Sequence, residues 1–377
     1  MSSVYIHIPY CRHKCTYCDF HFSVQKRSLN NVLDALIKEI DDRREYLDSK
    51  NLESIYFGGG TPSILSIKQL DVIFNRLSSI YFWNKNTEIT IECNPEDLNK
   101  EFVQGLKELG FNRISLGIQS LNDKVLQWMG RYHTVEQSLQ SIELLQKIGI
   151  DNFSIDIIFG LPFYDSEYIL KDLKFLVDKF HPPHISAYQL TIEPKTKLHH
   201  LVQKKKLIPA DDEKMAQEFL LIQEYLTKLE YIHYEVSNYA QKGFYSNHNS
   251  AYWLQKKYIG IGPSAHSYNG IERRWNISNN YIYAKNVLNG KIYWDKEELS
   301  TEQLYNEYIY TRLRTMYGCD LNEIVRLFGK KMKEDFLRNY ENYKEYFIVK
   351  NQTYCLVPNK GYLIADKIAV DFFVSYS

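Results

Sequence analysis

The segment YIHIPYCRHKCTYCDF, residues 5–20, contains three of the six cysteines of the chain. Cys11, Cys15 and Cys18 have the spacing C-x3-C-x2-C and follow a short apolar run that predicts a β-strand. Thiolates this close together on one loop can bind a single metal centre. A cubane iron–sulfur cluster has four irons, so three cysteine ligands would leave one iron free to bind a small molecule.

Two other interpretations of this cysteine motif stay open on spacing alone. A structural zinc site would need a fourth ligand, for which His13 and His21 are the nearest candidates. Alternatively, the thiols are buried and inert. The other three cysteines are isolated in the sequence, and we interpret them as small buried apolar side chains: Cys93, Cys319 and Cys355.

Length and charge narrow the class of protein. A chain of 377 residues is long enough for one large domain and a smaller one. Lys and Arg together number 46, as do Asp and Glu, so the net charge of zero argues against nucleic acid or an anionic membrane as the main partner. There is no apolar run long enough to span a membrane and no signal-peptide pattern. We therefore expect a cytoplasmic protein with reduced cysteines.

Six short β-rich runs alternate with amphipathic helical patterns in the first 229 residues. The predicted strands are Val4–Ile8, Glu53–Phe57, Thr87–Cys93, Asn112–Ile118, Phe153–Phe159 and His184–Ile192. Capping boxes at Ser66 and Thr134 each predict the start of a helix. Six strand–helix units in succession predict an α/β fold with parallel strands and right-handed crossovers. Functional groups should then lie at the carboxyl ends of the strands.

The pattern changes after Glu230 to Gly-, Asn- and Tyr-rich segments with brief strands. We expect a core barrel over residues 1–230, an extension over 231–293 and a smaller, mainly helical domain over 294–377. The elements predicted for this last domain are helices beginning at Thr301 and Asp320, a helix over 331–346, a hairpin of Tyr354–Val357 with Gly361–Ala365, and a final helix. Helices followed by a hairpin favour a winged-helix-like domain.

Glycines and polar side chains follow the predicted strands. The second strand is followed by Gly58, Gly59, Gly60 and Thr61, and consecutive glycines let the backbone approach a ligand closely. Other polar residues assigned to strand ends are Glu92, Gln119 and Asp156. A carboxylate at a strand end can bind ribose hydroxyls or an amino group, although an acid there can also cap the next helix. Arg131, just beyond a helical stretch, either pairs with a ligand carboxylate or is solvated.

Taken together, these motifs resemble the radical S-adenosylmethionine (SAM) superfamily. The phrases YIHIP at residues 5–9, IExNP at 91–95, LGIQS at 116–120 and DIIFGLP at 156–162 resemble its oxygen-independent coproporphyrinogen III oxidase branch. The resemblance implies a partial (β/α)6 TIM-like barrel followed by the smaller helical domain. It also implies a 4Fe–4S cluster on Cys11, Cys15 and Cys18, with SAM chelating the open iron.

The resemblance assigns further residues to cofactor binding. Those matching the SAM contacts of the superfamily are Tyr5, Gly59, Gly60, Thr61 and Glu92. Those matching positions around a second SAM in the oxidase are Tyr17, Gln119, Arg131 and Asp156. In the superfamily, reductive cleavage of SAM yields a 5′-deoxyadenosyl radical that abstracts hydrogen.

The chain departs from the oxidase pattern in two ways. Phe20 stands where the oxidase has a fourth cysteine, and the first strand begins at Val4 without the oxidase's N-terminal extension. Both departures, and the HNxxYW motif at residues 248–253, resemble the heme chaperones of this branch. That resemblance implies His248 as a ligand to heme iron. His266, in GIGPSAH, is a candidate for a residue of the pocket, and the alternative is that the glycines before it only form a tight turn.

We therefore expect a heme chaperone that binds heme and delivers it to apo-hemoproteins such as respiratory cytochromes, with transient contact to membrane cytochromes. The alternative is a coproporphyrinogen III oxidase that decarboxylates propionates of coproporphyrinogen III by radical chemistry. A zinc-stabilised binding module is a third hypothesis. No nucleic-acid partner is expected, and the sequence leaves open whether the protein is a homodimer.

Overall fold

The structure is a computed structural model that describes residues 2–375. Residues 1 and 377, the outer limits of the predicted domains, lie outside the described residues. Its centre is a 12-stranded sheet. The six predicted strands form six adjacent parallel strands of this sheet: β1 (Ser2–Ile8), β2 (Leu52–Gly59), β3 (Glu88–Cys93), β4 (Arg113–Gln119), β5 (Phe153–Phe159) and β6 (His184–Gln189). The predicted parallel α/β core is therefore confirmed.

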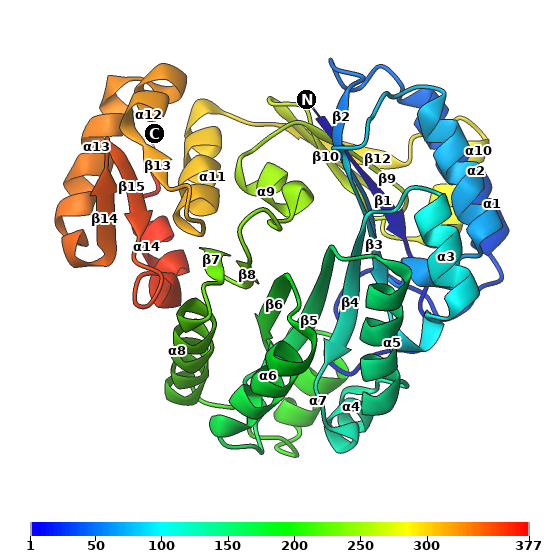
Figure 1. Cartoon of the computed structure of the whole chain (residues 1–377). Helices are drawn as coiled ribbons and strands as arrows, with labels where there is room; N and C mark the ends of the chain where they lie inside the picture. Colours follow the sequence, from blue (N-terminus) through cyan, green and yellow to red (C-terminus); the bar gives the residue numbers. More distant parts are fainter. Residues whose placement is uncertain (1, 376–377) are drawn as a thin grey trace.

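Helices cover the outer face of these strands (Figure 1). The helices of this part of the chain are α1 (Leu29–Asp42), α2 (Ile67–Ser78), α3 (Lys100–Glu108), α4 (Asp123–Met129), α5 (Val135–Ile148), α6 (Glu167–Phe180), α7 (Lys197–Gln203) and α8 (Asp212–Lys228), of which α4 and α7 lie at the carboxyl ends of the strands. Both predicted capping boxes are present, because Ser66 bonds with Gln69 and Thr134 with Gln137 in each direction. Of the eight helices, α7 was not predicted.

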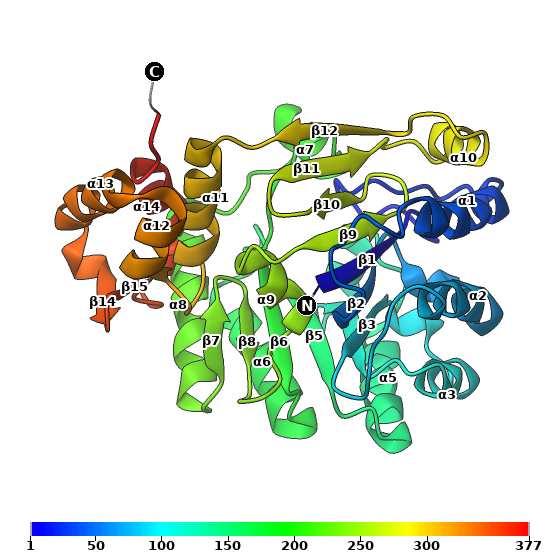
Figure 2. The ribbon, with the colours of Figure 1, turned by 90° about the horizontal axis from the view of Figure 1, so that it is seen from above.

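Segments after residue 230 extend the sheet at both edges. They form β7 (Ile232–Glu235), β8 (Asn238–Ala240), α9 (Asn247–Trp253), β9 (Tyr258–Ile261), β10 (His266–Tyr268), β11 (Glu272–Asn276), α10 (Asn280–Leu288) and β12 (Trp294–Glu298). β8 pairs antiparallel with β6, while β9 pairs parallel with β1. The sheet ends at β12 and β7, so it is an open, curved sheet rather than a closed barrel (Figure 2).

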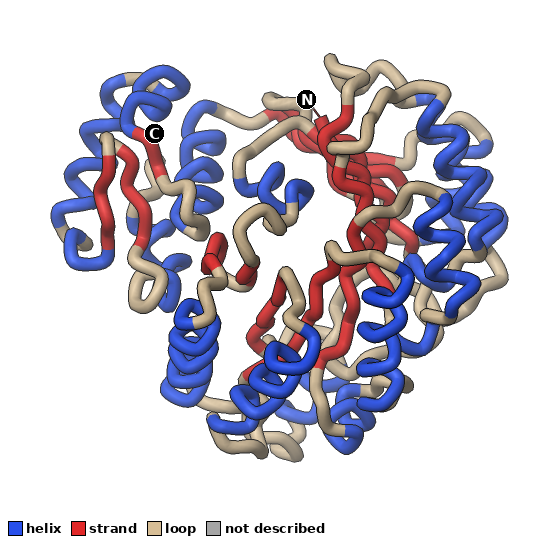
Figure 3. Tube along the Cα trace, in the orientation of Figure 1, coloured by secondary structure: helices blue, strands red, loops and turns tan. Residues whose placement is uncertain are grey.

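The remaining C-terminal region is mainly helical, as predicted (Figure 3). It contains α11 (Thr301–Leu313), β13 (Cys319–Asp320), α12 (Leu321–Phe328), α13 (Lys330–Glu341), β14 (Phe347–Lys350), β15 (Thr353–Leu356) and α14 (Ala365–Asp371). The predicted hairpin is wrong in register, because β15 pairs with β14 before it in the chain. The segment assigned to its second strand contains instead a 3-10 turn over Tyr362–Ile364.

One apolar core connects the sheet to this C-terminal region, since it extends from Val4 on β1 to Phe372 beyond α14. Cys93 and Cys319 are buried in that core, as predicted, whereas Cys355 is only partly buried. Within residues 2–375, no helix has the length and apolar character needed to cross a membrane.

Candidate functional site

The cysteine motif lies on the loop between β1 and α1, and two helices hold this loop in place. The Thr16 amide donates a 2.8 Å hydrogen bond to the Met129 carbonyl at the end of α4. The Leu198 amide of α7 donates a 3.1 Å bond to the Thr16 carbonyl. The loop containing Cys11, Cys15 and Cys18 is therefore anchored at its centre, although the three cysteines are themselves only partly buried.

The three thiols influence one another electrostatically. Burial raises the pKa of Cys11 to about 12 and that of Cys18 to about 11. Cys18 and Cys15 add to the shift of Cys11, and Cys15 adds to that of Cys18. Cys15 accepts a 3.7 Å hydrogen bond from Arg131 Nη1. The raised pKa values mean that ionising these thiols costs free energy. A metal that replaces the thiol protons would offset that cost. The donor set thus suits an electron-deficient centre with thiolate ligands.

No three His, Cys, Asp or Glu side chains in the described part of the chain are arranged to hold a single metal ion. Ligands of one zinc ion must converge on one point, whereas each thiolate of a cubane binds a different iron. Of the proposed fourth zinc ligands, His21 is hydrogen-bonded to Asn280 and His13 stacks on Tyr132.

The glycines at the end of β2, Gly59 and Gly60, lie against the end of β1. The Gly60 amide donates a 2.9 Å bond to the Ile8 carbonyl, and the Thr61 amide donates a 2.8 Å bond to the Tyr10 carbonyl. A Cβ on Gly60 would lie 2.7 Å from the Tyr10 carbonyl oxygen, and Gly59 has a φ of +107°. These positions therefore require glycine, and they place an open backbone edge beside the cysteine loop.

Arg131 and Gln119 meet above β4. Arg131 Nη2 donates bonds of 2.8 Å to Asn94 Oδ1 and 2.9 Å to the Gly117 carbonyl. Gln119 has a φ of +69° where the register of β4 shifts, an uncommon conformation that is often found at functional sites. Asn94 was not predicted as a site residue, although it lies in the IExNP phrase two positions after Glu92.

Tyr17 connects the cysteine loop to this arginine. Its ring packs on a small apolar cluster that includes Val125 and Leu198. Burial raises the pKa of Tyr17, and its neighbours Arg131 and Cys15 act on it in opposite directions. The structure therefore brings Tyr17, Arg131 and Cys15 together.

The two acidic residues of the predicted site lie inside the curved sheet. Glu92 accepts hydrogen bonds from Tyr56 Oη at 2.8 Å and from the Gly59 amide at 3.1 Å. Asp156 is bonded to Ser115 and Ser154, and it lies in the middle of β5 rather than at its end, which corrects the prediction. The alternative helix-cap interpretation is wrong for both acids, because the caps of α3 and α6 are other residues.

Burial raises the pKa of Glu92 from 4.5 to about 7, and the nearby charge of Asp156 adds to this shift. The folded chain therefore keeps a proton that the unfolded chain loses between those pH values. This contribution to stability is fully present below pH 4.5 and is lost as the pH rises through 7.

The side chain of Glu92→Gln is neutral at every pH. We expect the free energy of unfolding of Glu92→Gln, relative to that of the wild type, to be higher at pH 8 than at pH 5, by up to about 3 kcal/mol. Denaturant unfolding of both proteins at the two pH values measures the difference. Glu235, whose pKa burial also raises to about 7, is present in both and cancels. Identical pH dependence would show that Glu92 is ionised throughout.

His248 lies on α9, on the inner side of the sheet, and is 1% exposed. Its Nδ1 bonds to Ser54 Oγ at 2.8 Å and its Nε2 bonds to Tyr252 Oη at 3.0 Å. The ring also stacks on Tyr56 with centroids 4.7 Å apart. Both ring nitrogens are therefore occupied, so the predicted ligation of heme by His248 would require breaking one of these bonds.

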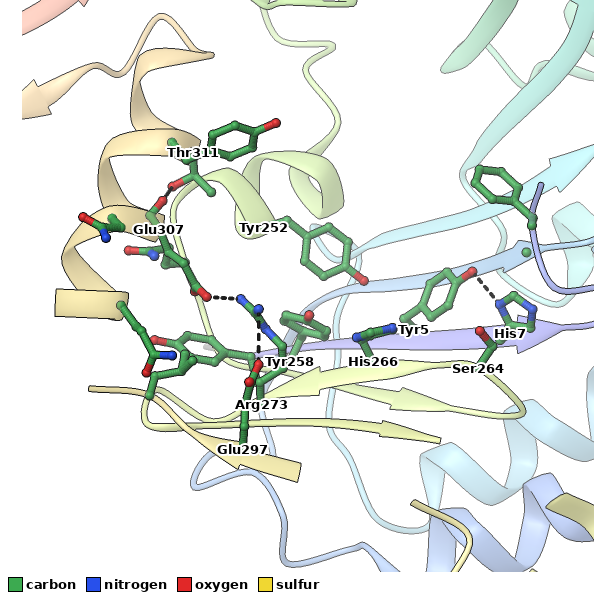
Figure 4. A pocket seen from close by; sticks show the side chains of 18 of the residues that line it. Tyr5, His7, Tyr252, Tyr258, Ser264, His266, Arg273, Glu297, Glu307 and Thr311 are labelled. Carbon is green, nitrogen blue, oxygen red and sulfur yellow. Dashed lines mark hydrogen bonds and ion pairs between the residues drawn. The ribbon is translucent and has the colours of Figure 1, made fainter. Parts of the chain in front are cut away.

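A cavity of about 1060 Å³ opens beside the carboxyl ends of β1, β2 and β3 (Figure 4). Tyr5 and Glu92 line one side, Phe20 and His21 of the cysteine loop border it, and α11 closes the far side. Its aromatic walls include Tyr252, Tyr258, Tyr268 and Tyr310. The cavity also contains Arg273 and Glu307, an ion pair between β11 and α11 that the sequence did not predict.

Comparisons with known proteins agree with this fold. A family model described as "Radical SAM superfamily" matches residues 5–176. The solved structure of coproporphyrinogen III oxidase (HemN) from Escherichia coli superposes with a TM-score of 0.83 over 99% of this chain and 90% of that chain, at 21% identity. The chain is therefore a radical SAM protein. Proteins of this class are associated with a 4Fe–4S cluster and SAM.

Curated relatives narrow this class. The heme chaperone HemW of Bacillus subtilis is 31% identical over 98% of each chain. The heme chaperone HemW of Lactococcus lactis is 35% identical over 90% of this chain and 87% of its own. The chain belongs to the HemW family of heme chaperones, the branch that the sequence motifs predicted.

Proposed function

We propose that this protein binds heme in the cavity beside the strand ends and delivers it to apo-hemoproteins. The observation that carries the proposal is the cavity itself, which at about 1060 Å³ is slightly larger than the usual range of ligand pockets, roughly 300–1,000 Å³. Its walls present tyrosine rings, and flat aromatic faces pack well against a flat macrocycle. Membership of the HemW family supports the same conclusion.

The proposal includes a 4Fe–4S cluster held by Cys11, Cys15 and Cys18. Residues that would contact a SAM bound beside it are Tyr5, Gly59, Gly60, Thr61 and Glu92. Those that would border a second SAM are Tyr17, Gln119, Arg131 and Asp156. The bound cluster and SAM would supply radical chemistry. The chain's own contribution is an open backbone edge at the glycines, buried carboxylates that accept hydrogen bonds, and a fixed arginine.

Phe20 favours the chaperone over the oxidase. It occupies the position where the oxidase pattern has a fourth cysteine, and the structure places its ring on the cavity, where it is 67% exposed. An exposed apolar side chain at the rim of a binding site is typical of a contact surface rather than of a metal ligand. At this position the chain therefore presents an apolar surface to a macrocycle.

The proposal also concerns the cellular location of the protein and the proteins that receive its heme. We propose a cytoplasmic protein that delivers heme to respiratory cytochromes through transient contact with membrane cytochromes. The balanced net charge supports recognition of partner proteins rather than of nucleic acid. A homodimer would fit the same proposal and can be measured by light scattering.

The test compares binding, delivery and catalysis in one anaerobic preparation reconstituted with iron and sulfide. We expect heme titration to saturate at one equivalent, and the loaded protein to lose its heme to an added apo-hemoprotein. We also expect no protoporphyrinogen when SAM, a reductant and coproporphyrinogen III are supplied. Formation of protoporphyrinogen would favour the oxidase instead, and failure to bind heme would remove the chaperone function.

A further inference from the structure

We infer that His266, the first residue of β10, is the side chain that ligates heme iron in the cavity. This inference rests on the proposed function and identifies the iron ligand within the same site. It differs from the assignment of the HNxxYW histidine, because a heme ligand needs an open ring nitrogen that faces the cargo.

The histidines of the cavity differ in which ring nitrogens are free. His7 Nδ1 bonds to Tyr5 Oη and its Nε2 bonds to the His21 carbonyl, each at 3.0 Å. His21 Nε2 bonds to Asn280 Oδ1 at 2.7 Å. Neither ring nitrogen of His266 has a hydrogen-bond partner in residues 2–375. Its ring stacks on Trp275, with centroids 6.3 Å apart, and is partly buried by its surroundings while it stays accessible to solvent. Figure 4 shows its ring among the side chains that face the cavity.

His266 is also held in its neutral form. Burial and the nearby Arg273 guanidinium lower the pKa of His266. At neutral pH the imidazole therefore has an unprotonated nitrogen, which metal ligation requires. On the same wall Arg273 is the cationic group of the cavity, paired with Glu307 and lying 3.6 Å from Glu297.

A buried ion pair fixes the loop on which His266 stands. Glu39 is fully buried on α1 and accepts hydrogen bonds from the Gly262 amide at 2.8 Å and from Arg43 at 3.0 Å. Arg43 also donates bonds of 2.8 Å to the Gly260 carbonyl and 2.9 Å to Ser267 Oγ. The ion pair therefore holds the chain on both sides of His266, and buried ion pairs of this kind fix a single geometry.

Two glycines make the turn tight enough for this arrangement. A Cβ on Gly260 would lie 2.0 Å from the His266 carbonyl oxygen, and Gly262 has a φ of +112°. The backbone amide of Asn276, on β11, donates a 2.9 Å hydrogen bond to the carbonyl of Ala265, the residue before His266. The backbone of His266 is thus positioned before any ligand arrives, and pre-positioning lowers the entropic cost of binding.

The test compares three single substitutions in the reconstituted full chain: His266→Ala, His200→Ala and His248→Ala. We expect heme affinity to fall about tenfold or more in His266→Ala only, with loss of the histidine-ligated absorption and electron paramagnetic resonance signals. Free imidazole should restore those signals in His266→Ala, because it fills the space of the missing ring. A role for His266 in structure alone would not give this rescue.

His200→Ala is the matched control, because His200 is an exposed histidine on α7 and is not among the residues that line the cavity. Circular dichroism and iron content check that each variant is folded and reconstituted. If His266→Ala keeps the wild-type affinity and spectrum, the inference is overturned. Loss of the histidine-ligated signals in His248→Ala would then assign the iron to His248. If the wild type itself binds no heme, the proposed function fails instead.

Discussion

Replacing Cys15 by serine is expected to reduce the iron and sulfide of the anaerobically reconstituted protein to about a tenth of the wild-type content or less. Two thiolates hold a cubane poorly, and a serine hydroxyl is a weak ligand for iron. The structure adds a second reason, because Cys15 Sγ is the thiol that accepts the hydrogen bond from Arg131. Iron and sulfide analysis, with the visible absorption of the cluster, measures the loss.

Cys355→Ser is the matched control, since Cys355 is also partly exposed but lies on β15, away from the loop. It should retain the wild-type iron content. A Cys15→Ser protein that keeps its full complement of iron would show that the metal is held elsewhere, and would remove the basis for a cluster on this loop.

Gly60→Ala should have the second largest effect. The added methyl group would meet the backbone of Tyr10 and the Ile8 carbonyl oxygen at 2.8 Å, and backbone atoms cannot rotate away as a side chain does. Overpacking of this kind costs about 1–3 kcal/mol. Because the displaced segment leads directly into the cysteine loop, we expect lower iron content as well as a lower free energy of unfolding.

Gly290→Ala separates this effect from the general cost of replacing a glycine. Gly290 has a φ of +65° with no atom near its Cβ position, so its replacement should cost about 1–2 kcal/mol and leave the iron content unchanged. Denaturant unfolding and iron analysis of both variants provide the comparison. Equal iron content in the two would mean that the contact between Gly60 and Tyr10 does not position the cysteines.

The six parallel strands were predictable because each is a short apolar run bounded by turn residues and followed by an amphipathic helix. The C-terminal hairpin was not. Asn351 and Gln352 connect β14 to β15 with φ values of +48° and +66°, yet Gln has little intrinsic preference for that conformation, so the turn gives no sequence signal. The Pro358-Asn359-Lys360 turn is a stronger signal but leads into a helical turn.

The candidate site was predictable where it depends on the order of strands. Carboxyl ends of adjacent parallel strands meet at one edge, so the cysteines, the glycines and Gln119 come together without further information. The far wall of the cavity depends instead on tertiary packing. β11 pairs with β12, and α11 follows β12, but the local sequence does not specify how α11 packs back on β11, so the ion pair of Arg273 with Glu307 could not be foreseen.

His248 and His266 illustrate the same limit. A motif indicates which residue types occur, but the availability of a ring nitrogen depends on neighbours from other elements. Ser54 on β2 occupies one nitrogen of His248, whereas within residues 2–375 no group forms a hydrogen bond with a ring nitrogen of His266. Only the folded chain distinguishes the two.

The most direct test of the central claim is to follow heme from the loaded wild-type protein to an apo-hemoprotein under anaerobic conditions. The proposed function predicts that the absorption of the donor disappears as that of the recipient's holo form appears, one heme for each chain. Heme that never binds, or that stays on the donor while the recipient remains empty, would contradict it.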